Sequence, residues 1–122
     1  MASGLQIGEG QSWLTRNWIF EQLLTDVMAY YPDDEEVREV LDAVGILGYL
    51  VVDNYDNGLG PRLARMIYCV AKGILEGSVP SGASAALGVS KQLLTAYQSG
   101  IQDLVRLIEA DGRYAVVLHH DG

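Results

Sequence analysis

Apolar residues recur every three or four positions through four segments of the chain, which is the spacing that places them on one face of an α-helix. These segments cover residues 13–31, 33–52, 61–76 and 84–110. Ser12 is a suitable N-cap for the first helix, because its hydroxyl can accept a free backbone N–H, and Pro32 ends that helix. Gly77 is expected to end the third. The pattern predicts four helices, or five if glycines divide the last one.

Two glycines interrupt the apolar stripe of the second predicted helix. Gly45 and Gly48 each cost roughly 1 kcal/mol relative to alanine inside a helix. The expected compensation is a close crossing with a neighbouring helix at this point.

The two ends of the chain depart from the helical spacing. Residues 1–11 (MASGLQIGEGQ) are glycine-rich and polar, which predicts a flexible arm. Residues 113–120 (RYAVVLHH) alternate and are β-branched, which predicts a short extended segment within the tail 113–122. Such a segment needs a pairing partner, which is the N-terminal LQI, a symmetry-related copy or another protein. The predicted fold class is therefore all-α: a compact four- to five-helix bundle with a short C-terminal extended segment.

Length and composition favour a single domain. The chain has 122 residues and is 49% apolar, enough for one core and too short for two. We therefore expect residues 1–122 to form one helical domain. The N-terminus lacks a basic and apolar leader, and the longest near-apolar run, residues 43–52, is too short to span a bilayer. These features favour a cytoplasmic protein.

The negative charge is concentrated in one part of the sequence. The net charge is −8, yet eight of the sixteen acidic residues and one of the eight basic residues lie between Asp33 and Asp56. Asp33 and Asp34 suit the first turn of a helix, where free N–H groups favour carboxylates. The acidic run continues past that turn, and Arg38 can relieve part of the repulsion by reaching Asp42 at i+4. Two interpretations remain open: a solvated helix face, or a surface for a basic partner.

If this surface binds a partner, its members are the acidic residues of the second helix and the following loop, together with two tyrosines. Rim charges mostly set the association rate, so buried aromatic anchors such as Tyr49 or Trp18 would supply affinity. The acidic balance argues against nucleic acid or an anionic membrane as the partner. The predicted partner-binding residues are Asp34, Glu35, Glu36, Glu39, Asp42, Tyr49, Asp53, Tyr55 and Asp56.

No motif indicates catalysis, a cofactor or a metal. The segment from Asp53 lacks the ligands that a calcium loop needs at its third and twelfth positions. Adjacent histidines near the C-terminus would point to opposite faces of a strand. Cys69 lies in an apolar helical pattern and is expected to be a small core residue. The sequence therefore predicts no catalytic residue, no metal site and no cofactor.

The order of elements resembles a known family. A helix that ends in YYP (residues 30–32) precedes VVDNYD (51–56), RLARMIYCVAKGILEG (62–77) and SAALGVSKQLLTAY (84–97). This order is similar to that of the small all-helical immunity proteins that protect bacteria from type VI secretion effectors, in particular toxins that attack NAD or alter nucleotides. The resemblance implies a non-enzymatic protein that binds one cognate toxin and blocks its active site.

The predicted function is thus an immunity or antitoxin-like inhibitor with an acidic helical surface that meets a basic cleft. The alternative is an oligomeric helical adaptor or regulatory subunit without catalytic activity, possible as a homodimer because small residues allow close self-association.

Overall fold

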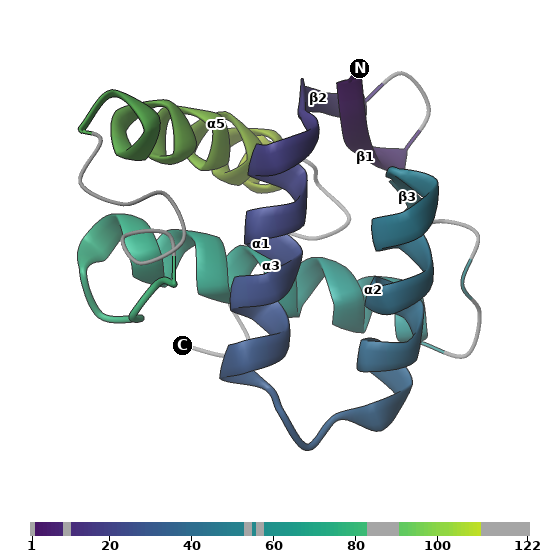
Figure 1. Ribbon diagram of the computed structural model, residues 1–122. Helices are drawn as coiled ribbons and strands as arrows, with labels where there is room; N and C mark the ends of the chain where they lie inside the picture. The colour runs from purple at the N-terminus through teal and green to yellow at the C-terminus, as the bar shows by residue number, and fades with distance from the viewer. Residues whose placement is uncertain (1, 9–10, 53–54, 56–57, 83–90, 111–122) are drawn as a thin grey trace.

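A small mixed sheet stands beside the helices in the computed structural model (Figure 1). The structure describes residues 2–8, 11–52, 55, 58–82 and 91–110. The predicted all-α class is wrong, because residues at the N-terminus and after the second helix form strands. The elements, labelled as in Figure 1, are β1 (Ala2–Gly8), β2 (Gln11–Arg16), α1 (Asn17–Tyr30), α2 (Glu35–Leu47), β3 (Tyr49–Val51), α3 (Leu59–Glu76) and α5 (Lys91–Ala110).

The sheet has the strand order β2-β1-β3, with β1 antiparallel to β2 and parallel to β3. Leu5 on β1 faces Trp13 on β2 and Leu50 on β3. All three of these side chains are buried. Because side chains alternate between the two faces of a strand, this row defines the inner face of the sheet, and its neighbours Leu14 and Tyr49 belong to the outer face.

The strands replace three features that the sequence pattern predicted. Residues 2–8 form β1 where a flexible arm was expected. Trp13 was assigned to the first helix, but it lies in β2, and α1 begins at Asn17. Leu50 was assigned to the second helix and lies in β3. The expected C-terminal extended segment lies outside the described residues, as does the predicted helical stretch 84–90.

Helix ends follow local chemistry. The Asp34 side chain caps α2 by accepting the Val37 N–H at 3.2 Å. Gly48 ends α2 in the left-handed region, with φ of 79°, which a residue with a Cβ rarely adopts. The prediction that Gly48 lies inside the second helix is therefore wrong. Gly77 ends α3 in the same conformation, as the sequence predicted.

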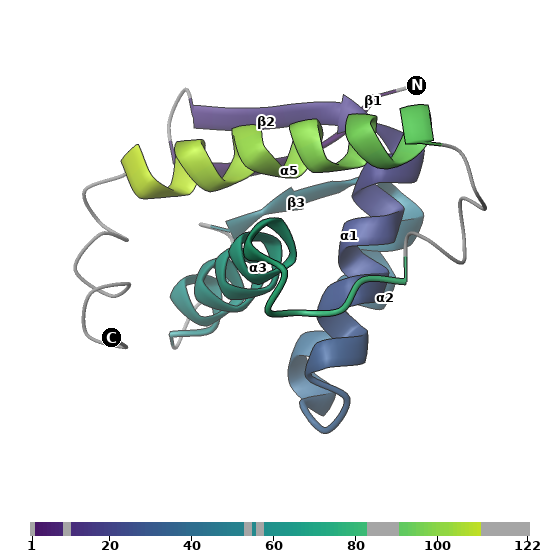
Figure 2. The same ribbon diagram turned by 90° about the vertical axis from the view of Figure 1, so that its left-hand side faces the viewer.

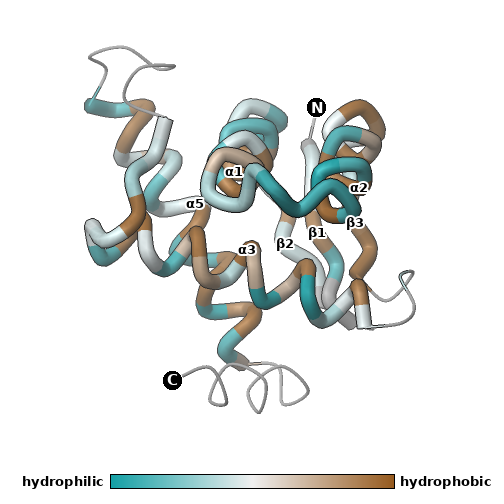
Figure 3. The backbone as a smooth tube through the Cα atoms, turned by 90° about the horizontal axis from the view of Figure 1, so that it is seen from below, coloured by the Kyte–Doolittle hydropathy of each residue, from teal (hydrophilic) through white to brown (hydrophobic). Residues whose placement is uncertain are grey.

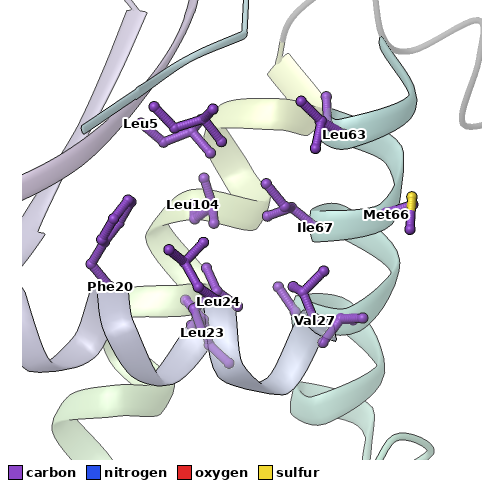
Figure 4. Close-up of a cluster of buried hydrophobic side chains, with 14 of the residues drawn as sticks. Leu5, Phe20, Leu23, Leu24, Val27, Leu63, Met66, Ile67 and Leu104 are labelled. Atoms are coloured by element: carbon purple, nitrogen blue, oxygen red, sulfur yellow. The ribbon is translucent and has the colours of Figure 1, made fainter. Parts of the chain in front are cut away.

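The core fills the space between the inner face of the sheet and the helices. Figure 2 shows α5 running along β2, with α3 beneath it. Figure 3 shows apolar and polar positions alternating along the helices, as expected for elements with one buried side. The cluster of Figure 4 joins Leu5 of β1 to side chains of three helices. These side chains are Phe20, Leu23, Leu24 and Val27 of α1, Leu63, Met66 and Ile67 of α3, and Leu104 of α5.

Candidate functional site

The acidic start of α2 is partly neutralised by a residue from α3. Arg62 Nη2 lies 2.9 Å from Asp34 Oδ1 and 3.0 Å from Glu36 Oε1. Both carboxylates are thus paired, and Asp34 also caps the helix. These two predicted partner-binding residues have a structural role, and the free acidic surface is smaller than the sequence suggested.

The remaining acidic residues of α2 form one exposed line. Glu35, Glu39 and Asp42 stand at i, i+4 and i+7, which places them on one face of the helix. That face is opposite to the buried side chains Val37 and Leu41. No ion pair joins Glu35, Glu39 or Asp42 to any residue that the structure describes. We call these three residues the acidic ridge.

Arg38 does not relieve the repulsion on this ridge. Its Nη1 donates to the carbonyl oxygen of Pro32 at 3.2 Å, back toward the start of α2. The predicted contact between Arg38 and Asp42 is therefore wrong. The ridge keeps its negative charge.

Two recesses border the ridge. A recess of about 590 Å³ lies at the turn between α1 and α2, which Figure 3 shows to be hydrophilic. A groove of about 260 Å³ lies between α1 and α2 and includes Asp42. In the recess at the turn, the rings of Tyr30 and Tyr31 pack edge to face with centroids 5.0 Å apart. The first recess is lined by Tyr30, Tyr31, Pro32, Asp33, Asp34, Glu35 and Arg62.

The predicted tyrosines differ in exposure. Tyr49 on β3 is 37% exposed, and its hydroxyl donates to Gln6 Oε1 at 3.2 Å. Tyr55 is partly buried against the core, and its N–H donates to the Val52 carbonyl. Tyr49 is therefore available to a partner, and Tyr55 much less so. Asp53 and Asp56 lie outside the described residues.

An exposed apolar patch adjoins the end of α2. Ile46 is 88% exposed and Leu47 77% exposed, and Leu14 on β2 is 66% exposed. Together with Tyr49 they form what we call the apolar patch. Of these four residues, only Tyr49 was among the predicted partner-binding residues. The helical period alone places Ile46 on the exposed face of α2, whereas it places Leu47 on the apolar stripe with Val40 and Val44, and the exposure of Leu14 required knowledge of the sheet.

A buried carboxylate network was also missed. Asp26 is 3% exposed, and its oxygens accept hydrogen bonds from Tyr97 (2.7 Å), Ser81 (2.5 Å), the Gly82 N–H (2.9 Å) and Gln22 (3.1 Å). A carboxylate has about four lone-pair sites, so these four donors saturate it. The network ties α1, α5 and the chain after α3 together, and it offers no free oxygen to a ligand.

Burial changes the pKa of Tyr97, the tyrosine of this network. Desolvation raises the pKa of Tyr97 far above its ordinary value, and the adjacent Asp26 raises this pKa further. The phenol is therefore a permanent donor, which suits a structural role. The available sequence signal was a carboxylate between Leu23 and Val27 on an otherwise apolar helix face.

A second polar cluster joins α3 to α5 at the surface. Tyr68 donates to Glu109 Oε2 at 2.7 Å, and Lys72 Nζ lies 3.0 Å from the same oxygen. The hydrogen bond from Tyr68, followed by that from Lys72, lowers the pKa of Glu109. Hydrogen bonds to Tyr68 and Glu109 raise the pKa of Lys72. These side chains are paired with one another, and their interactions join α3 to α5.

Among the described residues, no three or more histidine, cysteine, aspartate or glutamate side chains are placed so that they could hold a metal ion together. Cys69 is exposed on α3, so the prediction of a core cysteine is wrong. None of the described helices combines the length and apolar character needed to cross a membrane.

Fold and surface define a mostly helical protein with a three-stranded mixed sheet and an acidic, partly apolar face on α2. Comparisons with family models, with curated proteins and with solved structures found no match to this chain.

Proposed function

We propose that this protein is a non-catalytic binding protein that uses the exposed face of α2 to dock on a basic protein. The observation that supports this proposal most strongly is the acidic ridge. Its three carboxylates share one helix face and make no ion pair with any residue that the structure describes. The form of this function that we favour is inhibition of a toxin, in which the acidic face covers a cationic active-site cleft.

The ridge is unfavourable for the isolated chain. Like charges three or four residues apart on a helix destabilise it by roughly 0.2–0.5 kcal/mol per pair. The helix dipole offers little compensation beyond the first turn. A partner that supplies lysine or arginine side chains removes this repulsion on binding, and it is also attracted over a distance.

The polar interior supports a binding role over a catalytic one. Asp26 is the buried carboxylate best placed for acid–base chemistry, and four donors saturate it. Perturbed groups at catalytic sites usually face a cleft, whereas Asp26 and Tyr97 are enclosed by packed elements.

The test begins with the products of the genes adjacent to this one. Each is expressed with the tagged full-length chain, and a complex that co-purifies is measured by titration calorimetry at low and high salt. We expect one basic product to bind, with a Kd that rises steeply with salt. If none of the adjacent products binds, the immunity function is wrong.

Charge variants then test the surface. Glu35→Lys with Glu39→Lys should raise the Kd by roughly tenfold or more, because each reversal replaces an attraction with a repulsion. The matched control is Glu76→Lys with Asp103→Lys, which makes the same charge change at exposed positions of α3 and α5. Equal effects of the two double variants would show that net charge matters and the α2 face does not.

A further inference from the structure

The apolar patch of Leu14, Ile46, Leu47 and Tyr49 has a well-defined floor. A Cβ added to Gly4 would lie 2.8 Å from Leu14 Cδ2 and 3.2 Å from Tyr49 Cε2, so both side chains lie over the glycine. Their positions follow from the register, in which Gly4 faces Leu14 on one side and Tyr49 on the other. The outer face of the sheet therefore carries a continuous apolar row.

The end of α2 is attached to the same point. The Gly4 N–H donates to the Gly48 carbonyl at 3.1 Å, so the last turn of α2 lies next to this row. Ile46 and Leu47 immediately precede Gly48 and are among the most exposed apolar residues described. Figure 1 shows β1, β3 and the end of α2 at the same corner of the molecule.

The patch continues directly from the acidic ridge. Glu35, Glu39, Asp42 and Ile46 stand at i, i+4, i+7 and i+11, so one exposed face of α2 changes from acidic to apolar toward its C-terminus. A partner that contacts the ridge along this face reaches Ile46 next.

From this continuity we propose that the apolar patch is the anchor for a protein surface that presents apolar side chains flanked by lysine or arginine. This inference rests on the proposed function and adds the residues that supply affinity. Affinity in protein interfaces comes mainly from a few buried apolar or aromatic contacts, and the surrounding charges mostly set the association rate.

Size and charge favour this occupant over a second copy of the chain. Four side chains expose a few hundred Å², whereas a specific interface buries about 800 Å² on each partner. The contact must therefore extend over neighbouring surface, and along α2 that surface is the acidic ridge. A second copy would bring a chain of net charge −8 against these carboxylates, while a basic partner neutralises them.

The probe is a short amphipathic helical peptide of leucine and lysine, and its control has every leucine replaced by serine. Both are titrated into the isotopically labelled full-length protein and followed by NMR and calorimetry. We expect the leucine–lysine peptide to shift the amide signals of Gly4, Leu14, Gly48 and Tyr49. The serine–lysine peptide should shift signals of the ridge alone and bind more weakly.

One double variant and one single control variant test the contribution of the apolar patch. Ile46→Ser with Leu47→Ser should raise the Kd of the leucine–lysine peptide by roughly tenfold and leave the serine–lysine peptide unaffected. Leu93→Ser is the matched control, since Leu93 is also exposed but lies on α5, on the far side of α1 from α2 (Figure 1). Circular dichroism confirms that each variant is folded.

The outcomes distinguish the two proposals. If the Kd is indifferent to Ile46→Ser with Leu47→Ser but rises with Glu35→Lys and Glu39→Lys, the anchor is wrong and the acidic docking face stands. If the Kd of the leucine–lysine peptide changes neither with salt nor with Glu35→Lys and Glu39→Lys, the proposed function is wrong. The inference of an anchor for a basic partner is then wrong as well. A dimer in sedimentation velocity that Ile46→Ser and Leu47→Ser abolish would identify a second copy as the occupant and overturn the inference.

Discussion

Replacing Tyr97 by phenylalanine should cost far more stability than the same change at Tyr68. Both substitutions remove one phenolic hydroxyl that donates to a carboxylate at 2.7 Å. At Tyr97 the donor and Asp26 are buried, whereas the Tyr68 hydroxyl and Glu109 are in contact with solvent. Tyr68→Phe is thus a control that removes the same kind of donor at a solvent-accessible site, where the hydroxyl also accepts a hydrogen bond from Lys72 at 2.9 Å.

The expected magnitudes follow from that difference. A hydrogen bond to a charged group contributes about 1.5–3 kcal/mol when its loss leaves the partner desolvated. Asp26 keeps three donors after Tyr97→Phe, so we expect a loss of about 2 kcal/mol. At Tyr68, water can replace the lost donor, and the cost should stay within about 0.5 kcal/mol.

Urea denaturation followed by circular dichroism measures both values. For a protein of this size, about 2 kcal/mol lowers the midpoint by roughly 1 M at unchanged slope. If Tyr97→Phe shifts the midpoint no more than Tyr68→Phe does, the Asp26 network does not hold α1 and α5 together. A changed slope for Tyr97→Phe alone would instead mean that the variant alters the compactness of one of the two states.

Three further substitutions test other parts of the fold. Gly45→Ala should stabilise the protein by about 0.5–1 kcal/mol, because an added Cβ would make an ordinary 3.8 Å contact with Leu24 and the chain loses freedom when unfolded. Gly60→Ala should destabilise it by about 1–3 kcal/mol, because the Cβ would lie 2.5 Å from the Val52 carbonyl oxygen; equal urea midpoints for these two variants would contradict the packing argument. Hydrogen bonds from the tyrosine and lysine of α3 hold the pKa of Glu109 below its ordinary 4.5, so its stabilisation is present above that pH and is lost as the pH falls through the folded-state pKa. The difference in unfolding free energy between wild type and Glu109→Gln, at most about 0.5 kcal/mol for so exposed a group, should therefore shrink between about pH 6 and pH 3, and a constant difference in acid titrations would refute the coupling.

The helices were largely predictable because their signals are local. The apolar period of residues 61–76 matches α3, and Gly77 ends it as expected, since a left-handed C-cap depends on the residue at that position. The acidic face of α2 also followed from the sequence, because residues four apart share a face whatever the rest of the chain does. The pairing of Asp34 and Glu36 with Arg62 did not, since that arginine is 28 residues away from Asp34 in the chain.

The strands were missed because their evidence is not local. Trp13 fits a helical spacing with later apolar residues. It nevertheless lies in a strand, because there it pairs with Leu5 and its indole N–H donates to the Gly100 carbonyl. β3 has three residues, too few to show alternation, and it exists because β1 offers a parallel edge to it. Pairing between distant segments is decided by tertiary packing, which no window of the sequence contains.

The sequence by itself therefore determined the approximate extent of the helices, the end of α3 at Gly77 and the concentration of negative charge, because each of these depends on residues a few positions apart. It did not determine the start of α1, since Ser12, the predicted N-cap, lies in β2. Only the tertiary structure decided which carboxylates of α2 are paired, that Leu14 and Tyr49 both lie over Gly4, and which donors surround the buried Asp26. The physical reason is the same in each case: hydrogen bonds and apolar contacts between distant segments form only once the whole core is assembled.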